Sequence, residues 1–67
     1  MSKLATMRKA RGLSQVALAY AADVNIRSLQ SYESGARDFN KADVTTVYKL
    51  ARALGCNMED LIDTENI

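Results

Sequence analysis

The residues of this chain best suited to chemistry lie between positions 26 and 34, where polar side chains recur at helical spacing. Leu29 and Tyr32 are three residues apart, which places both on one inward face of a helix. The opposite face carries mostly hydrogen-bonding or cationic groups: Ile26, Arg27, Gln30, Ser31 and Ser34. A helix that enters the major groove of DNA needs such side chains near its N-terminus. We therefore expect this face to contact base edges.

Each of these side chains has its own expected contact. The guanidinium fork of Arg27, in the first turn, matches the O6 and N7 acceptors of guanine. Ser31 lies one turn later and is suited to a base edge or a phosphate, and Gln30 flanks it at the groove edge. Ile26 is suited to a thymine methyl group. A solvated helix surface is the plain alternative, but such a surface has no reason to expose a branched apolar side chain.

A second set of residues is suited to the phosphates of DNA. Gln15 lies at the start of the preceding helix, where free N–H groups and the helix dipole favour an anion. Ser34, Arg37 and Lys41 are expected to contact phosphates on the other side of the groove. Contacts of this kind position a protein on DNA without reading its sequence.

Two short helices joined by a tight turn must position these residues. Ser14 is the predicted cap of the first helix, and Asp23 ends it. Asn25 is the predicted cap of the second, which ends at Gly35. The turn between steeply crossing helices requires a positive φ, which aspartate tolerates. The sequence therefore predicts a helix-turn-helix over about residues 14–34.

Further helices are predicted at residues 2–11, 41–54 and 58–62. Asn40 is the expected cap of the longest, with Asp43 as an acid in its first turn, and Asn57 caps the last. No strand is predicted. The expected fold class is all-α, a compact five-helix bundle that forms one domain over residues 1–67.

Arg8 and Glu33 form a predicted structural ion pair. Arg8 belongs to the first helix, and Glu33 follows the inward-facing Tyr32 at the end of the third. Pairing would tie these two helices together. A partly desolvated pair fixes geometry more than it adds stability.

Composition excludes several classes of function. The chain has one cysteine, Cys56, and no histidine, so the usual zinc spacings, an internal disulfide and an activated cysteine nucleophile are all absent. Cys56 is expected to be a small buried residue at a helix end. No apolar run reaches the roughly 20 residues of a membrane span. We expect a cytoplasmic protein with no metal, no cofactor and no enzymatic activity.

The net charge of +1 conceals an uneven distribution. Residues 1–37 hold six cations and two anions, and residues 38–67 hold three cations and six anions. The first part therefore carries +4 and the second −3. This asymmetry indicates a basic face directed at a polyanion, although ordinary scatter of charges is an alternative.

Several sequence runs extend the pattern over most of the chain: Arg8 to Gln15 with Leu18-Ala19, Val24-Asn25, Leu29-x-x-Tyr32-Glu33-x-Gly35, Val47-x-x-Leu50-Ala51-x-Ala53-Leu54 and Met58-x-x-Leu61-Ile62. Together they resemble the Cro/lambda-repressor-like helix-turn-helix domains of phage and bacterial regulators. The resemblance covers roughly residues 4–62. It implies a five-helix domain that binds operator DNA, usually as a dimer on a pseudo-palindrome.

The resemblance also implies roles for single positions. The family's base-reading positions fall on Ile26, Arg27 and Ser31, its phosphate contacts on Gln15 and Ser34, and its interhelical ion pair on Arg8 and Glu33. Three features depart from the family pattern. Asp23 replaces a usual glycine, the loop after Arg37 lacks a common proline, and Ile26 is less polar than most residues at its position.

The sequence therefore predicts a sequence-specific DNA-binding transcriptional regulator, a repressor or small controller, that binds double-stranded DNA as a homodimer. A protein-interaction module on the same fold, antitoxin-like or bridging, is the alternative. No small-molecule ligand is evident. Candidate dimer residues are Val44, Tyr48, Leu61 and Ile62. Of these, Val44 and Leu61 are better explained as core.

Overall fold

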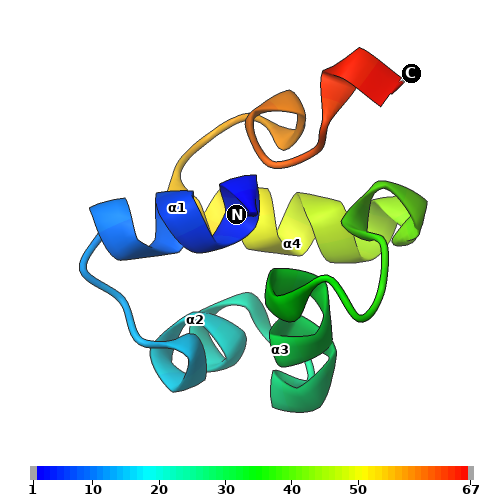
Figure 1. Cartoon of the computed structure of the whole chain (residues 1–67). Coiled ribbons are helices and arrows are strands. Elements are labelled where there is room, and N and C mark those ends of the chain that lie inside the picture. The colour runs from blue at the N-terminus through cyan, green and yellow to red at the C-terminus, as the bar shows by residue number, and fades with distance from the viewer. Residues whose placement is uncertain (1, 67) are drawn as a thin grey trace.

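The computed structural model describes residues 2–66, which form four α-helices joined by short connections (Figure 1). The helices are α1 (Lys3–Ala10), α2 (Gln15–Ala22), α3 (Ile26–Ser34) and α4 (Val44–Leu54). Single turns of 3-10 helix are η1 (Phe39–Lys41), η2 (Met58–Asp60) and η3 (Thr64–Asn66). No strand occurs within residues 2–66, so the all-α prediction is confirmed.

The prediction of five helices is wrong, because the segment after α4 forms 3-10 turns instead of a fifth α-helix. In η2 the N–H of Asp60 donates to the carbonyl of Asn57 at 3.1 Å, and that of Leu61 donates to Met58 at 3.0 Å. Both bonds span three residues, as in a 3-10 helix. A segment this short forms too few bonds to offset the cost of starting an α-helix.

The two central helices begin where the sequence predicts. The Ser14 hydroxyl accepts from the N–H of Ala17 at 3.0 Å and caps α2. The Asn25 side chain accepts from the N–H groups of Arg27 and Ser28, at 2.8 and 3.3 Å, and caps α3. These bonds satisfy N–H groups that have no partner within the helix.

The fourth helix begins at Asp43, and the prediction that Asn40 caps it is wrong. The Asp43 carboxylate accepts from the N–H of Thr46 at 2.9 Å. Asn40 lies in η1, and its side chain bonds instead to the backbone of Asp63. Both residue types are good caps, so a contact distant in sequence decides which of them starts the helix.

The turn between α2 and α3 has the predicted left-handed residue. Asp23 adopts φ 55° and ψ 50°, and no other residue apart from glycine has a positive φ within residues 2–66. The third helix ends at Gly35 with φ 86°. The left-handed region favours glycine, and among other residues aspartate and asparagine adopt it most readily.

One apolar cluster holds all four helices together. Its fully buried members are Leu4, Leu18, Leu29, Leu50 and Leu54, so every α-helix contributes at least one. Burying a leucine side chain contributes about 1.5–3 kcal/mol. Tyr32 and Phe39 extend the cluster, with ring centroids 5.1 Å apart and planes inclined by 66°.

The expectations for Val44 and Leu61 have opposite outcomes. Leu61 is buried, as expected for a core residue. Val44 is 68% exposed, so its expected place in the core is wrong. It is the first residue of α4 and lies at the border of the buried stripe that contains Val47 and Leu50.

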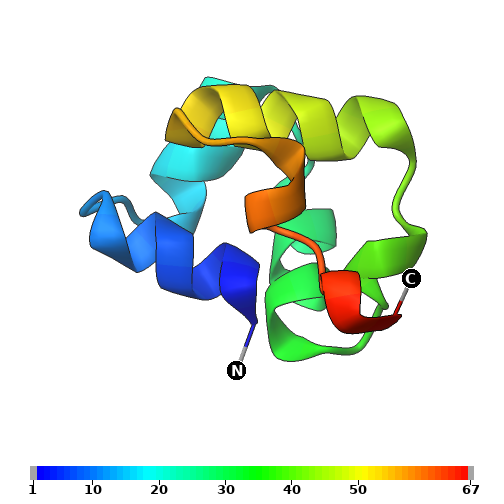
Figure 2. The same cartoon turned by 90° about the horizontal axis from the view of Figure 1, so that it is seen from above.

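The helices are arranged so that α3 is supported from behind. Helix α2 packs against both α3 and α4, and α1 contacts α3. In Figure 1, α2 and α3 lie side by side below α1 and α4. Seen from above, the chain after α4 crosses back over the bundle towards η1 (Figure 2). One face of α3 therefore packs inward while the other is left open.

Candidate nucleic-acid interface

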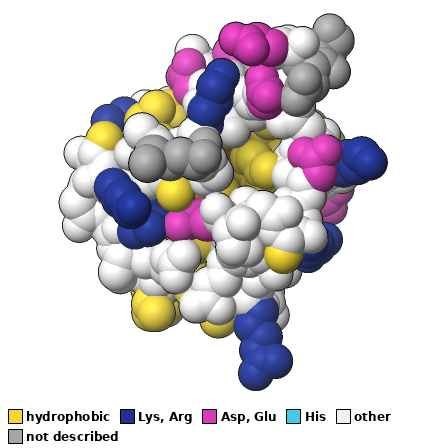
Figure 3. All heavy atoms as spheres, viewed as in Figure 1, with side chains coloured by type: hydrophobic (Ala, Val, Ile, Leu, Met, Phe, Trp, Pro, Cys, Tyr) yellow, Lys and Arg dark blue, Asp and Glu magenta, His cyan; other side chains and the backbone are white. Residues whose placement is uncertain are grey.

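The outer face of α3 is polar and accessible. Arg27, Gln30 and Ser34 are exposed, and Ser31 is half-buried. Within residues 2–66 the Arg27 side chain makes no hydrogen bond or ion pair, so its guanidinium fork is free to bind a ligand. Figure 3 shows a cationic side chain that projects from the lower edge of the molecule, where α3 lies.

The structure corrects the expectation for Ile26. This residue is half-buried and packs against the hydrophobic cluster, so it is not the freely exposed apolar side chain that the sequence suggested. Side chains on a helix lean towards its N-terminus, and for the first residue of α3 that direction leads back to the turn. The polar character of this surface therefore depends on Arg27 and its polar neighbours.

Arg8 and Glu33 lie in contact between α1 and α3. The Nε of Arg8 donates to one carboxylate oxygen of Glu33 at 2.7 Å, and Nη2 donates to the other at 2.9 Å. The remaining Nη1 donates to the carbonyl of Leu13 at 2.8 Å. The two side chains are only 11% and 5% exposed. Arg8 thus joins the end of α3 to α1 and to the connection before α2.

The charged forms of both groups are stabilised in this pair. Burial alone would raise the pKa of the Glu33 carboxyl, but hydrogen bonds from Arg8 and Gln15 outweigh it and hold that pKa below its ordinary value. The hydrogen bond to Glu33 raises the pKa of Arg8. Both residues are therefore ionised at neutral pH.

Gln15 belongs to the same network. Its Nε2 donates to Glu33 at 3.0 Å, and its oxygen accepts from Nε2 of Gln30 at 3.5 Å. One amide therefore joins the first residue of α2 to the buried carboxylate and to the outer face of α3. The sequence placed Gln15 at a helix start but carried no signal for these two contacts.

The remaining residues predicted to contact phosphate have different surroundings. The Ser34 hydroxyl donates to the carbonyl of Ser31 at 3.2 Å and accepts from the N–H of Ala36 at 3.3 Å. The Arg37 guanidinium lies over the Tyr32 ring, 4.7 Å from its centroid. Lys41 is exposed in η1.

Two side-chain contacts, one beside α3 and one at the end of α4, were not identified from the sequence. The Ser28 hydroxyl accepts from Nη1 of Arg37 at 3.4 Å and helps to place that guanidinium beside α3. The Nε of Arg11 donates to the carbonyl of Leu54 at 2.8 Å and so binds the end of α4. Both contacts join segments that are separate in sequence, and neither residue type alone predicts its partner.

The structure gives little support for a metal site, a reactive cysteine or a membrane-spanning helix. Within residues 2–66 no three His, Cys, Asp or Glu side chains are grouped closely enough to hold a metal ion. Cys56 is half-buried beside Gly55, and its pKa is raised by burial and by the charge of Asp60. None of the described helices has the length and apolar character needed to cross a membrane.

Comparison with known proteins identifies the class. A family model described as helix-turn-helix matches residues 4–61. The chain is similar to a solved structure, the restriction-modification controller protein C.AhdI from Aeromonas hydrophila, with 30% identity and a TM-score of 0.79. The match covers 90% of this chain and 86% of that chain. A search of curated proteins finds no match.

The chain belongs to the Cro/lambda-repressor-like helix-turn-helix family, which confirms the predicted resemblance. It is a DNA-binding transcriptional regulator and not an enzyme. In this fold the second helix of the motif, here α3, is the one that enters the major groove.

Proposed function

We propose that this regulator reads a specific operator through the outer face of α3. Arg27 contacts guanine, Ser31 contacts a base edge, and Gln30 lies at the edge of the groove. Ile26 offers its accessible side to a thymine methyl. The observation that carries the proposal is the exposed Arg27 guanidinium, which has no partner within residues 2–66 and lies in the first turn of α3.

Phosphate contacts from both sides of the groove position α3. At the start of α2, the Gln15 side chain and the first N–H groups of the helix bind one phosphate. Ser34, Arg37 and Lys41 bind phosphates on the other side. Arg37 is supported by Tyr32 and Ser28, so little side-chain freedom is lost when it binds.

The regulator acts as a small controller or repressor by occupying its operator. This proposal is supported by the similarity to C.AhdI, which is described as a restriction-modification controller protein. A protein bound at an operator blocks or assists polymerase according to where the operator lies. We expect no catalytic step in this mechanism.

The functional unit is a homodimer on a pseudo-palindrome. A single α3 buries too little surface for the usual specific affinity, and two-fold pairing places a second α3 about 34 Å away. Exposed apolar side chains on α4 support this proposal, since Val44 is 68% and Tyr48 is 53% exposed. Their positions, four residues apart, place them on one face of the helix.

Selection of binding sites from randomised duplexes tests the proposed function. We expect an inverted repeat whose half-sites are about one helical turn apart. Affinity for the selected site should fall steeply with salt, because phosphate contacts release counterions. Failure to enrich any sequence, together with affinity that does not change with salt, would favour the protein-interaction module instead.

The dimer surface has a separate test. Tyr48→Glu places a charge beside Val44 and should shift sedimentation equilibrium towards the monomer. Affinity for the full palindrome should fall while affinity for an isolated half-site is unchanged. Tyr20→Glu is the matched control, because Tyr20 is a 90% exposed tyrosine on α2. A Tyr48→Glu protein that stays dimeric would exclude this surface.

A further inference from the structure

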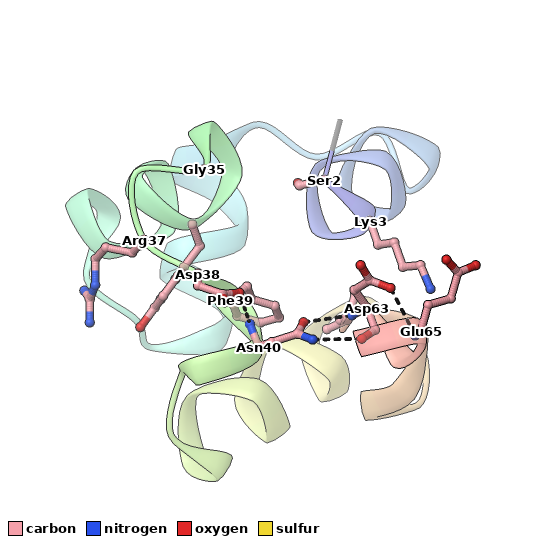
Figure 4. A pocket seen from close by; sticks show the side chains of 11 residues that line it. Ser2, Lys3, Gly35, Arg37, Asp38, Phe39, Asn40, Asp63 and Glu65 are labelled. Carbon is pink, nitrogen blue, oxygen red and sulfur yellow. Dashed lines mark hydrogen bonds between the residues drawn. The ribbon is translucent and has the colours of Figure 1, made fainter. Parts of the chain in front are cut away.

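The side chain of Asn40 makes two hydrogen bonds to the backbone of one residue, Asp63. Its Nδ2 donates to the carbonyl of Asp63 at 2.8 Å, and its oxygen accepts from the N–H of Asp63 at 2.8 Å (Figure 4). The side-chain amide therefore donates one hydrogen bond to the backbone of Asp63 and accepts one from it, as a backbone peptide group does between paired strands of a sheet. These two bonds, the Asn40 clamp, join segments that are 23 residues apart.

The Asn40 clamp holds the loop that follows α3. Asn40 is the middle residue of η1, and the next residue is Lys41. On its inner side the loop is fixed by Phe39, which is buried against Tyr32. On its outer side it borders a cavity of about 480 Å³, which Asn40 and Asp63 help to line (Figure 4).

The side-chain amide of Asn40 supplies both the donor and the acceptor that the backbone groups of Asp63 require. Alanine supplies neither bond, and a carboxylate at position 40 accepts a hydrogen bond but cannot donate one. The Asp38 carboxylate already accepts from the N–H of Asn40 at 3.0 Å, so the backbone and the side chain of Asn40 are both fixed. A loop ordered in this way loses less conformational freedom when it contacts DNA.

We propose that Asn40 is a positioning residue for DNA binding, because it ties the C-terminal segment at Asp63 to the loop that presents Arg37 and Lys41 to phosphate. The inference rests on the phosphate contacts in the proposed function. It assigns a role in DNA binding to a segment that is distant in sequence from the helix-turn-helix. The role concerns affinity for any DNA and not the choice of sequence.

The test compares the full chain with two variants that break the clamp from opposite ends. Asn40→Ala removes both side-chain bonds, and Asp63→Pro removes the backbone N–H that donates to Asn40. The Asp63 carboxylate also accepts from the N–H of Glu65 at 3.1 Å, so Asp63→Asn, which keeps the backbone N–H and removes the negative charge, is the reference for Asp63→Pro. Thr64→Ala is the matched control, because it changes an exposed neighbour of Asp63 and leaves the clamp intact. Affinity for the selected operator and for random DNA is measured over a range of salt concentrations.

We expect Asn40→Ala to weaken binding to both DNAs equally, by roughly fivefold to tenfold. The slope of log affinity against log salt concentration should fall by about the amount that one phosphate contact contributes. Asp63→Pro should have a similar effect relative to Asp63→Asn. Adding Asn40→Ala to Asp63→Pro should weaken binding little further. Thr64→Ala should bind like the unchanged protein. A purely structural role would lower thermal stability but leave the salt slope of the folded protein unchanged.

Other results would overturn the inference. A folded Asn40→Ala protein with unchanged affinity and slope would show that the clamp does not position the loop. If both single variants are unfolded by circular dichroism, the clamp serves folding and the inference is wrong. The proposed function fails separately, if the unchanged protein binds DNA without a salt slope.

Discussion

Arg8 and Glu33 form a bidentate ion pair that joins the C-terminal end of α3 to α1. The Nε and Nη2 atoms of Arg8 lie 2.7 and 2.9 Å from the two carboxylate oxygens of Glu33. The pair is almost entirely shielded from solvent. Gln15 adds a third hydrogen bond to the same carboxylate, so three helices meet at Glu33. The attachment of α3 to α1 and α2 therefore depends in part on one buried carboxylate and its hydrogen-bond partners.

Removing one member of this pair should destabilise the protein strongly. We expect Glu33→Gln to lower the free energy of unfolding by about 3 kcal/mol, because Arg8 would remain as an uncompensated buried charge. Urea denaturation measures the loss. The double variant Arg8→Met with Glu33→Leu is the control and should lose less, since neither charge remains. An unchanged unfolding midpoint in Glu33→Gln would contradict this account of the pair.

Stability should fall at acid pH for the same reason. The pKa of Glu33 is lower in the folded protein than its ordinary value of 4.5, so its contribution is present above that value and is lost as pH falls through the folded pKa. We expect the melting temperature to drop between about pH 5 and pH 3, and to drop less in Glu33→Gln.

A second carboxylate contributes to this acid dependence. The pKa of Asp43 is lowered by hydrogen bonds from Thr46, so its stabilising effect is lost in the same direction. Asp43→Asn keeps a cap at α4 and removes this titration.

Identical pH profiles for Glu33→Gln and the unchanged protein would show that Glu33 does not titrate as described.

Gln15→Ala should weaken binding to operator and random DNA by the same factor. The lost amide is expected to contact phosphate, which carries no sequence information. Fluorescence anisotropy with both duplexes measures the two affinities. Val16→Ala is the control, since Val16 is the exposed neighbour of Gln15 on α2. A loss confined to the operator would point instead to the contact between Gln15 and Gln30.

Asp23→Gly should raise stability slightly. Asp23 has φ 55°, a region that costs most side chains roughly 1–2 kcal/mol and glycine almost nothing. The flexibility of glycine in the unfolded chain offsets part of this gain. Lys49 is 4.0 Å from Asp23 at the surface, a contact that contributes little. We expect a gain of about 0.5–1 kcal/mol by thermal denaturation, and a lower melting temperature would contradict it.

The helix-turn-helix could be predicted because its signals are local. Ser14 and Asn25 cap the helices that follow them, and Asp23 supplies the turn. Each depends on bonds within four residues along the chain. The buried stripes also follow helical spacing, so the cluster around Leu18 and Leu29 needed no information about distant contacts.

The predictions that proved wrong concern residues whose surroundings are set by contacts distant in sequence. Asn40 and Asp43 are both suitable caps, and Asn40 is drawn away by its bonds to Asp63. Val44 and Ile26 are first residues of helices, where packing against the rest of the molecule, and not helical spacing, sets exposure. The contact between Gln15 and Gln30 likewise depends on how α2 and α3 cross.

The most direct test of the central claim is the effect of Arg27→Ala on affinity for the selected operator and for random DNA. If α3 reads bases, the variant loses about 1–3 kcal/mol on the operator, relaxes the preference at one base pair and binds random DNA almost unchanged. Equal losses on both duplexes would show that Arg27 contacts only phosphate and would contradict base reading by this residue.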